Sequence, residues 1–378
     1  MTKLTLFNQT KDKKSICKVI IDDCSHSNQL GIDFKEIKSS LSSLFSDIKI
    51  IKSICEKPEQ LSEIIHRDKT KNIIIIGFGN KEHICKYKSV DLSNIPPSKI
   101  QIVDIRLLNA YQKNTDAFKF NVYLAAIQST ISSDIELKPI HKPFKLNNKV
   151  SRRNLFRAAS TILKEYSDIP VYQNSLCGSL INSCPHCIKS CPYGAVTKKD
   201  SNIIIIAESC VRCGACCVSC PTGALQLPDL TNHQMISILE SIVTHEEKIN
   251  NTRLLFTCNQ SNEVIAKWNV NLPQDVALIQ IPCISILGFT HTMLAASYEI
   301  NVIALCPNNF CKQKDTLTFT RAETSIANSI IQEGNSTFPE LKIIEADKLE
   351  NVKSLLNDIF KKQVTQEYLQ LTKLQRDH

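Results

Sequence analysis

The chain has 378 residues, of which 43% are hydrophobic and 22% are charged, and its formal net charge is +8. This length and balance indicate a globular protein with two or three domains, and they exclude a disordered or a fibrous chain. Seventeen cysteines are too many for chance, and they are too clustered along the chain for a disulfide framework.

The N-terminal end lacks the features of an export signal. Lys11 and Asp12 follow the first ten residues, where the apolar region of a signal peptide should run. We therefore expect a cytoplasmic, reducing environment in which the thiols are metal ligands. The longest stretch without a charge, between Asp275 and Glu299, is interrupted by Pro282 and Gly288, which favours a strand, a loop and a buried helix over a membrane span.

Residues 1–14 are expected to form a tail. In residues 15–131, short apolar runs typical of strands alternate with segments that have the apolar spacing of a helix. Strands are expected over 17–24, 48–54, 73–76 and 101–105, and helices over 34–45, 58–66 and 115–129. Such alternation predicts an α/β domain with a parallel sheet covered on both faces. Gly77-Phe78-Gly79-Asn80 follows the third strand but lacks the third glycine of a dinucleotide fingerprint. No flavin or NAD is therefore expected in this chain.

Residues 132–165 form the expected linker and a lead-in helix. The linker contains Pro139, Pro143 and several lysines, with little periodicity. Ser151 stands before Arg152 and Arg153 as a candidate N-cap of the helix that leads into the next domain.

Residues 166–230 hold two cysteine ladders, and each ladder ends in Cys-Pro. The second ladder has the spacing C-x2-C-x2-C-x3-C-P, and the first has a longer gap after its first cysteine. The first consists of Cys177, Cys184, Cys187 and Cys191, and the second consists of Cys210, Cys213, Cys216 and Cys220. Three closely spaced thiolates can bind one face of a 4Fe-4S cube, whose fourth ligand must arrive from elsewhere. A zinc ribbon is the alternative, but tetrahedral zinc would leave the third cysteine of each ladder unused.

The two ladders resemble the bacterial two-cluster ferredoxins. This resemblance implies that cluster I is bound by Cys177, Cys184, Cys187 and Cys220, and cluster II by Cys191, Cys210, Cys213 and Cys216. The glycine after each Cys-Pro-x is expected to adopt backbone angles that other residues avoid. Cys217 is expected to be a buried thiol without a ligand role, and His186 a loop residue near the cluster.

Residues 231–360 are predicted to form a third, Rossmann-like α/β domain, followed by a tail over 361–378. A helix is expected over 231–247, and three later strands end in cysteines. These are Cys258, Cys283, and Cys306 with the nearby Cys311. Because parallel strands share a carboxyl edge, where open α/β sheets keep their sites, the four thiols are expected to converge there.

Two further resemblances concern the ends of the chain. The N-terminal region resembles the first domain of the A subunit of heterodisulfide reductase. The matching segments are Val19-Ile-Ile-Asp-Asp-Cys24, the segment around Cys55, and Val103-Asp-Ile-Arg106. This resemblance implies that Cys24 and Cys55 are candidate ligands of a further 4Fe-4S cluster. Cys85 is a candidate replacement for that family's next cysteine. The three strand-end phrases resemble the delta subunit of methyl-viologen-reducing hydrogenases, which implies a 2Fe-2S cluster at Cys258, Cys283, Cys306 and Cys311.

These features predict an electron-transfer subunit of a cytoplasmic oxidoreductase complex of the hydrogenase or heterodisulfide reductase type. Its expected partners are other redox subunits or a flavoprotein. Iron-sulfur clusters with four thiolates would cancel much of the positive charge, so the charge does not indicate nucleic acid. The alternatives are an iron-sulfur reductase with an open-site cluster that acts on a disulfide or sulfur compound, and a metal-stabilised interaction module without redox activity.

Overall fold

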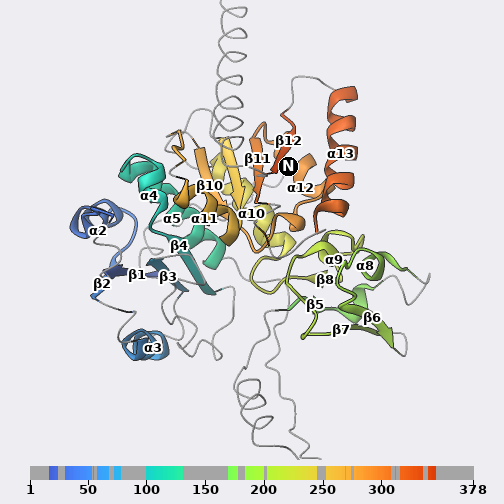
Figure 1. Ribbon diagram of the computed structural model, residues 1–378, viewed down its shortest axis with the longest axis horizontal. Coiled ribbons are helices and arrows are strands. Elements are labelled where there is room, and N and C mark those ends of the chain that lie inside the picture. Colours follow the sequence, from blue (N-terminus) through green and yellow to red (C-terminus); the bar gives the residue numbers. More distant parts are fainter. Residues whose placement is uncertain are drawn as a thin grey trace, which may run out of the picture.

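The structure is a computed structural model (Figure 1). It describes residues 17–23, 30–52, 54, 58–67, 72–77, 99–130, 169–177, 184–199, 202–244, 253–268, 270–273, 276–307, 311, 316–334 and 339–345. The expected tails at 1–14 and 361–378, and the expected linker and lead-in helix over 132–165, lie outside these residues.

The N-terminal part is a four-stranded parallel sheet, as expected from the alternating pattern. Its strands are β1 (Cys17–Asp23), β2 (Asp47–Lys52), β3 (Asn72–Gly77) and β4 (Ile100–Asp104). The strand order is β2-β1-β3-β4, and each neighbouring pair is parallel. The helices are α2 (Phe34–Leu41), α3 (Pro58–Arg67), α4 (Leu107–Ala110) and α5 (Thr115–Thr130).

Both faces of this sheet are covered, which explains why its central strands are unbroken runs of isoleucine and valine. Val19 and Ile21 of β1 join a hydrophobic cluster with residues of α2 and α5, whereas Ile20 joins residues of α3 on the opposite face. Successive side chains of a strand point to opposite faces, so a strand buried on both sides must be apolar throughout. Burying one such side chain contributes about 1.5–3 kcal/mol to folding.

The C-terminal part is a second four-stranded parallel sheet. Its strands are β9 (Arg253–Thr257), β10 (Val276–Gln280), β11 (Asn301–Cys306) and β12 (Leu341–Glu345), in the order β10-β9-β11-β12. The helices are α10 (Asn232–Thr244), α11 (Asn259–Lys267), α12 (Phe289–Ser297) and α13 (Leu317–Gly334). No helix in the described part of the chain has the length and apolar character needed to cross a membrane.

The cysteine-rich part (residues 169–230) is built from short elements. They are β5 (Val171–Tyr172), α8 (His186–Lys189), β6 (Val196–Lys199), β7 (Asn202–Ile205), α9 (Ala215–Val218) and β8 (Leu225–Gln226), with a 3-10 turn η4 (Asn174–Leu176) after β5. β5 pairs with β8 and β6 pairs with β7, and both pairs are antiparallel. The described part of the chain is therefore mixed α/β, and it contains two parallel sheets.

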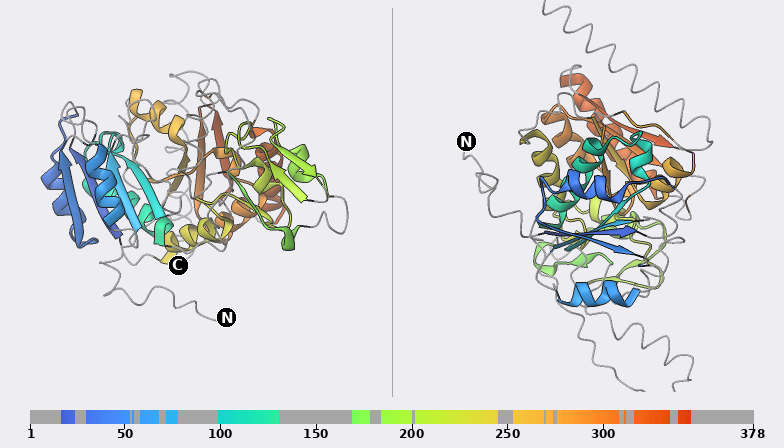
Figure 2. Two further views of the ribbon diagram at one scale, coloured as in Figure 1. Left: turned by 90° about the horizontal axis from the view of Figure 1, so that it is seen from below. Right: turned by 90° about the vertical axis from the view of Figure 1, so that its left-hand side faces the viewer.

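The C-terminal sheet packs against both other parts of the chain. Leu255 and Leu278 join the hydrophobic cluster that contains β1 and α2, whereas Leu254 and Phe256 join a second cluster that reaches into the cysteine-rich part. Helix α5 contacts β3 and β4 of the first sheet and β10 of the second. Figure 2 shows the resulting arrangement, with the C-terminal sheet between the N-terminal sheet and the cysteine-rich part.

Candidate metal centres

The two cysteine ladders fold into matching halves. Helices α8 and α9 contact each other, and each stands just before the last cysteine of its ladder. Ser190 and Ser219, which precede the two Cys-Pro pairs, are joined by a hydrogen bond of 2.7 Å between their hydroxyl oxygens. Gly194 and Gly223 have φ values of +59° and +67°, which confirms the backbone angles expected after each Cys-Pro-x. The repeat in the sequence is thus a repeat in the structure.

A first cavity is lined by four cysteines from both ladders. Cys177, Cys184 and Cys187 come from the first ladder, and Cys220 comes from the second. The other lining residues are mostly apolar, and they include Tyr172, Ile203 and Leu225. His186, the first residue of α8, is exposed and also lines this cavity. Four thiols around an apolar space are the donor set that a 4Fe-4S cluster uses, so these residues fit that group.

A second cavity has the complementary set of thiols. Cys210, Cys213 and Cys216 come from the second ladder, and Cys191 comes from the first. The backbone N–H of Ala195 donates to Cys191 Sγ at 3.2 Å. The lining residues also include Arg212, whose guanidinium pairs with Asp229. The donor set again fits a 4Fe-4S cluster.

Burial keeps several of these thiols protonated in the absence of metal. It raises the pKa of Cys187 to about 11 and that of Cys213 to about 12, and the charges of neighbouring cysteines add to the effect. Cys216 is the exception, because a hydrogen bond from the side chain of Cys217 lowers its pKa. Cys217 itself is buried, as expected, and does not line either cavity. Since metal ligands are thiolates, a cluster that binds here must displace protons.

The three strands that end in cysteines are neighbours in the C-terminal sheet. β10, β9 and β11 lie side by side and parallel, so Cys258, Cys283 and Cys306 stand at one edge. We call these residues, together with Cys311, the strand-end site. Cys258 Sγ lies 3.2 Å from the Ser261 hydroxyl oxygen, and that hydroxyl donates to the Leu305 carbonyl oxygen beside Cys306. Burial and the charge of Cys283 raise the pKa of Cys258 to about 11.

The four cysteines of the strand-end site differ in burial. Cys258, Cys283 and Cys306 are buried, whereas Cys311 is half-buried. Within the residues that the structure describes, no three His, Cys, Asp or Glu side chains are arranged around a point where a single metal ion would sit. A common ligand set for these four thiols therefore stays a prediction.

The N-terminal candidates cannot be placed, because Cys24, Cys55 and Cys85 all lie outside the described residues. Cys17 lies in β1 and is buried, with its sulfur 3.9 Å from the Ser129 hydroxyl oxygen. Burial raises its pKa. Cys17 is therefore part of the hydrophobic core, as its place in a strand predicts.

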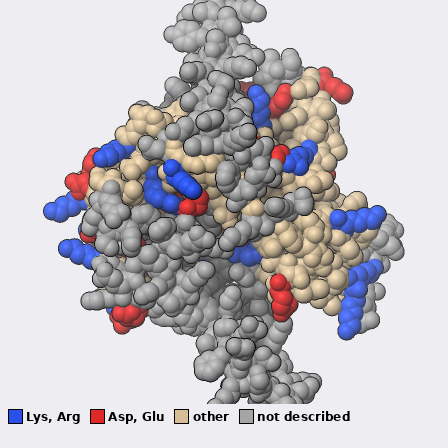
Figure 3. Space-filling model, viewed as in Figure 1, with Lys and Arg blue, Asp and Glu red and all other residues tan. Residues whose placement is uncertain are grey.

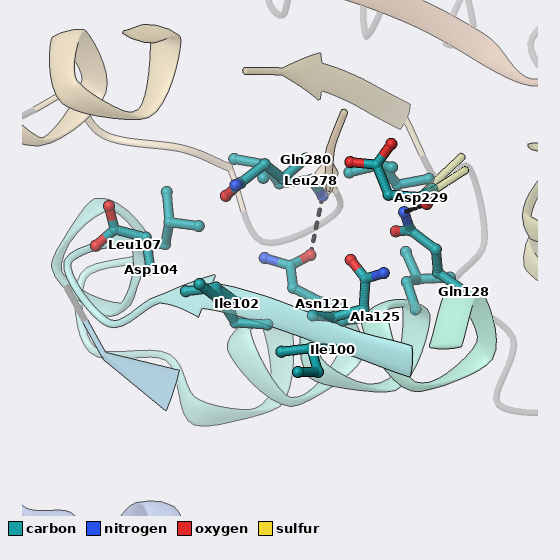
Figure 4. Close-up of a pocket in the computed structure, with 14 residues that line it drawn as sticks. Ile100, Ile102, Asp104, Leu107, Asn121, Ala125, Gln128, Asp229, Leu278 and Gln280 are labelled. Carbon is teal, nitrogen blue, oxygen red and sulfur yellow. Dashed lines mark hydrogen bonds between the residues drawn. The ribbon is translucent and has the colours of Figure 1, made fainter. Parts of the chain in front are cut away.

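A cavity without cysteines lies between the edge strands of the two sheets. It has a volume of about 220 Å³ and is lined by residues of β4, α5 and β10. Figure 4 shows Asn121 reaching from α5 to Leu278 of β10, whose backbone N–H donates to Asn121 Oδ1 at 2.9 Å. Asp104, at the end of β4, pairs with Arg106. This cavity was not predicted from the sequence, because its polar and apolar lining residues have ordinary spacing and come from separate elements.

Basic side chains are exposed on the cysteine-rich part. Lys189 on α8, and Lys198 and Lys199 on β6, are exposed. Figure 3 shows Lys and Arg side chains along this edge of the molecule. Lys198 pairs in register with Ile203, which lines the first cavity, so positive charge lies close to that cavity.

Comparison with known proteins gives partial similarities. No protein-family model matches the chain. The B chain of the anaerobic dimethyl sulfoxide reductase of Escherichia coli is 31% identical over 94 residues, which are 23% of the present sequence and 45% of that protein. Two uncharacterized ferredoxins of Methanocaldococcus jannaschii are each 33% identical, over 54 residues (14% of the present sequence and 36% of the ferredoxin) and over 51 residues (12% and 31%).

The chain thus spans less than half the length of each of these relatives. Ferredoxins carry electrons on iron-sulfur clusters, and the thiol-lined cavities have the donor set for such clusters. The similarity to ferredoxins and to a component of a reductase supports an electron-transfer role linked to iron-sulfur chemistry.

Proposed function

We propose that this chain is an electron-transfer subunit of a cytoplasmic oxidoreductase complex of the hydrogenase or heterodisulfide reductase type. One 4Fe-4S cluster is bound by Cys177, Cys184, Cys187 and Cys220, and the other is bound by Cys191, Cys210, Cys213 and Cys216. A 2Fe-2S cluster is bound at the strand-end site. These groups supply one-electron carriers, and their electrons pass on to another redox protein of the complex.

The observation that carries the proposal is the exchange of the fourth cysteine between the two ladders. Each cavity takes three thiols from one ladder and a fourth from the other. A zinc ribbon binds its metal with two pairs of ligands, whereas each cavity here combines three cysteines of one ladder with one of the other. The exchange is typical of two-cluster ferredoxins, in which the fourth cysteine of each run ligates the other cluster.

The protein around the thiols controls their protonation and their access to water. The apolar lining of the first cavity limits solvent contact, which is one determinant of a cluster's reduction potential. In the second cavity, the backbone N–H of Ala195 donates to Cys191 Sγ, and hydrogen bonds to ligand sulfurs are another determinant of the potential. The lining residues of the two cavities differ, with His186 at the first and Arg212 at the second, so we expect two separate reduction potentials.

The test is anaerobic purification followed by iron and sulfide quantification and by EPR of the reduced protein. Roughly eight irons per chain correspond to the two 4Fe-4S clusters alone, about ten add a 2Fe-2S centre, and about fourteen add an N-terminal cluster as well. About ten is the expected value. A colourless protein that binds zinc would contradict the electron-transfer proposal.

A further inference from the structure

The cysteine-rich part contacts the C-terminal sheet through the segment that follows β10. This segment contains Cys283 and the 3-10 turn η5 (Ile284–Ile286), and η5 contacts α9. Cys283 is buried in a small hydrophobic cluster with Cys213 and Ala215, and Val211 packs against it. Cys213 also lines the second cavity. A thiol of the strand-end site and a thiol of the second cavity therefore share one apolar contact.

Two glycines allow this close approach. A Cβ atom on Gly288 would lie 2.2 Å from Cγ1 of Val218 in α9, which is closer than real Cβ atoms approach. A Cβ atom on Gly214 would lie 3.1 Å from Ile286, and Gly214 also has a φ of +77°, which favours glycine. Gly214 lines the second cavity as well. The two parts thus approach closely at two points, where the backbone of Gly214 meets the side chain of Ile286 and the backbone of Gly288 meets the side chain of Val218.

Among the described residues, no cysteine of the first cavity belongs to the small cluster of Cys213 and Cys283. Cys187 of the first cavity belongs instead to the large cluster that also contains Cys216 and Cys306. Leu176, next to Cys177, is 46% exposed. The first cavity is therefore not joined to Cys283 by the apolar contact that Cys213 of the second cavity makes.

We propose that the contacts at Gly214 and Gly288 hold Cys213 against Cys283, so that the centre in the second cavity, and not the one in the first, exchanges electrons with the strand-end site. This inference rests on the proposed function. One electron leaves one centre as the other accepts it, and no atoms are transferred. The first cavity then holds the terminal centre, which meets an external redox partner. Gly214 and Gly288 are positioning residues, because they bind no cluster themselves and only set the distance between Cys213 and Cys283.

The experiment measures magnetic interaction between centres by EPR on the full chain, purified anaerobically and reduced. In the wild type we expect the EPR signal of the strand-end site to be split or broadened. Cys177→Ser impairs the first centre and should keep this splitting. Cys191→Ser impairs the second centre and should abolish it. Gly288→Ala should reduce the splitting with iron content unchanged. Gly334→Ala is the matched control, since its added methyl group meets no atom within 4 Å.

The remaining outcomes of this experiment contradict either the inference or the proposed function. Splitting that survives Cys191→Ser and disappears in Cys177→Ser overturns the inference, and so does a full set of centres without any interaction. If Gly288→Ala does not fold, the two cysteine variants still decide the question. Iron-free, colourless wild-type protein would overturn the proposed function itself, whereas iron-loaded protein with uncoupled centres, or with about eight irons and no strand-end signal, overturns only this inference.

Discussion

Tyr111 donates a hydrogen bond from its hydroxyl to the backbone carbonyl oxygen of Val276 at 2.9 Å. Tyr111 follows α4 in the N-terminal part, and Val276 begins β10 of the second sheet. Asn121 extends the connection, because its Nδ2 donates to the Tyr111 hydroxyl at 2.9 Å and its Oδ1 accepts from Leu278 N. These buried hydrogen bonds fix the N-terminal part against the strand that leads to Cys283.

Removing the Tyr111 hydroxyl should weaken the whole fold. In Tyr111→Phe, the carbonyl of Val276 and the amide of Asn121 each lose a buried partner, so the free energy of unfolding should fall by about 1–3 kcal/mol. Asn121→Ala should act on the same network. The two changes combined should therefore be non-additive by about 0.5–3 kcal/mol, as measured by anaerobic denaturant titration. Simple additivity would show that the hydrogen bonds do not act as one unit.

Because each cavity takes its fourth cysteine from the other ladder, a substitution of the last cysteine of one ladder should damage the centre that is bound mainly by the other ladder. Cys220→Ser lies in the second ladder but should damage the centre of the first cavity, because Cys220 lines that cavity. Cys191→Ser should conversely damage the second centre. Iron quantification and EPR of each variant test this. Cys217→Ser is the control, since its buried thiol lines neither cavity, and it should keep both centres. Loss of the second centre in Cys220→Ser would refute the assignment.

Most of the fold could be predicted because its signals are local. The run Ile73 to Ile76 predicts a strand buried on both faces, and β3 has that environment. The parallel order of both sheets follows from the alternation of strands and helices. The repeated Cys-Pro-x-Gly phrase also predicted the positive φ of Gly194 and Gly223.

The features that were not predicted depend on contacts between distant residues. β12 and the short antiparallel pairs of the cysteine-rich part have weak hydrophobic patterns, and a two-residue strand such as β5 has no period of its own. Asn121 and Tyr111 gain their importance from Leu278 and Val276, more than 150 residues away. Gly288 has an extended backbone, so its need for glycine arises from Val218 alone.

The exposed lysines of β6 should accelerate docking of an acidic redox protein at the first cavity. The double variant Lys198→Glu and Lys199→Glu reverses the charge beside Ile203, which lines this cavity. We expect a slower second-order reaction with a small acidic ferredoxin and a weaker dependence of that rate on salt. The double variant Lys35→Glu and Lys38→Glu on α2 is the control, because it makes the same change in net charge at exposed positions of the N-terminal part. Equal effects of the two double variants would indicate a general charge effect and no local docking.

His291 should make the fold sensitive to acid. It is buried in α12, its Nδ1 has no hydrogen-bond partner among the residues that the structure describes, and burial lowers its pKa from 6.5 to about 4. Between these values the unfolded chain binds a proton that the folded chain excludes, so stability falls as the pH drops from about 6.5 towards 4, by up to about 1.4 kcal/mol per pH unit. His291→Leu should remove this dependence.

The measurement is the thermal unfolding midpoint of both proteins, recorded anaerobically from pH 7.5 to 5. Clusters that lose stability in acid affect both proteins alike, so the difference between the variants isolates the imidazole. The midpoint of His291→Leu should rise relative to wild type as the pH falls below about 6.5, because only the wild type then takes up an additional proton on unfolding. His233→Gln replaces an exposed histidine of α10 and should leave the wild-type pH profile unchanged. Parallel profiles for wild type and His291→Leu would show that His291 already binds its proton in the folded protein, against the lowered pKa.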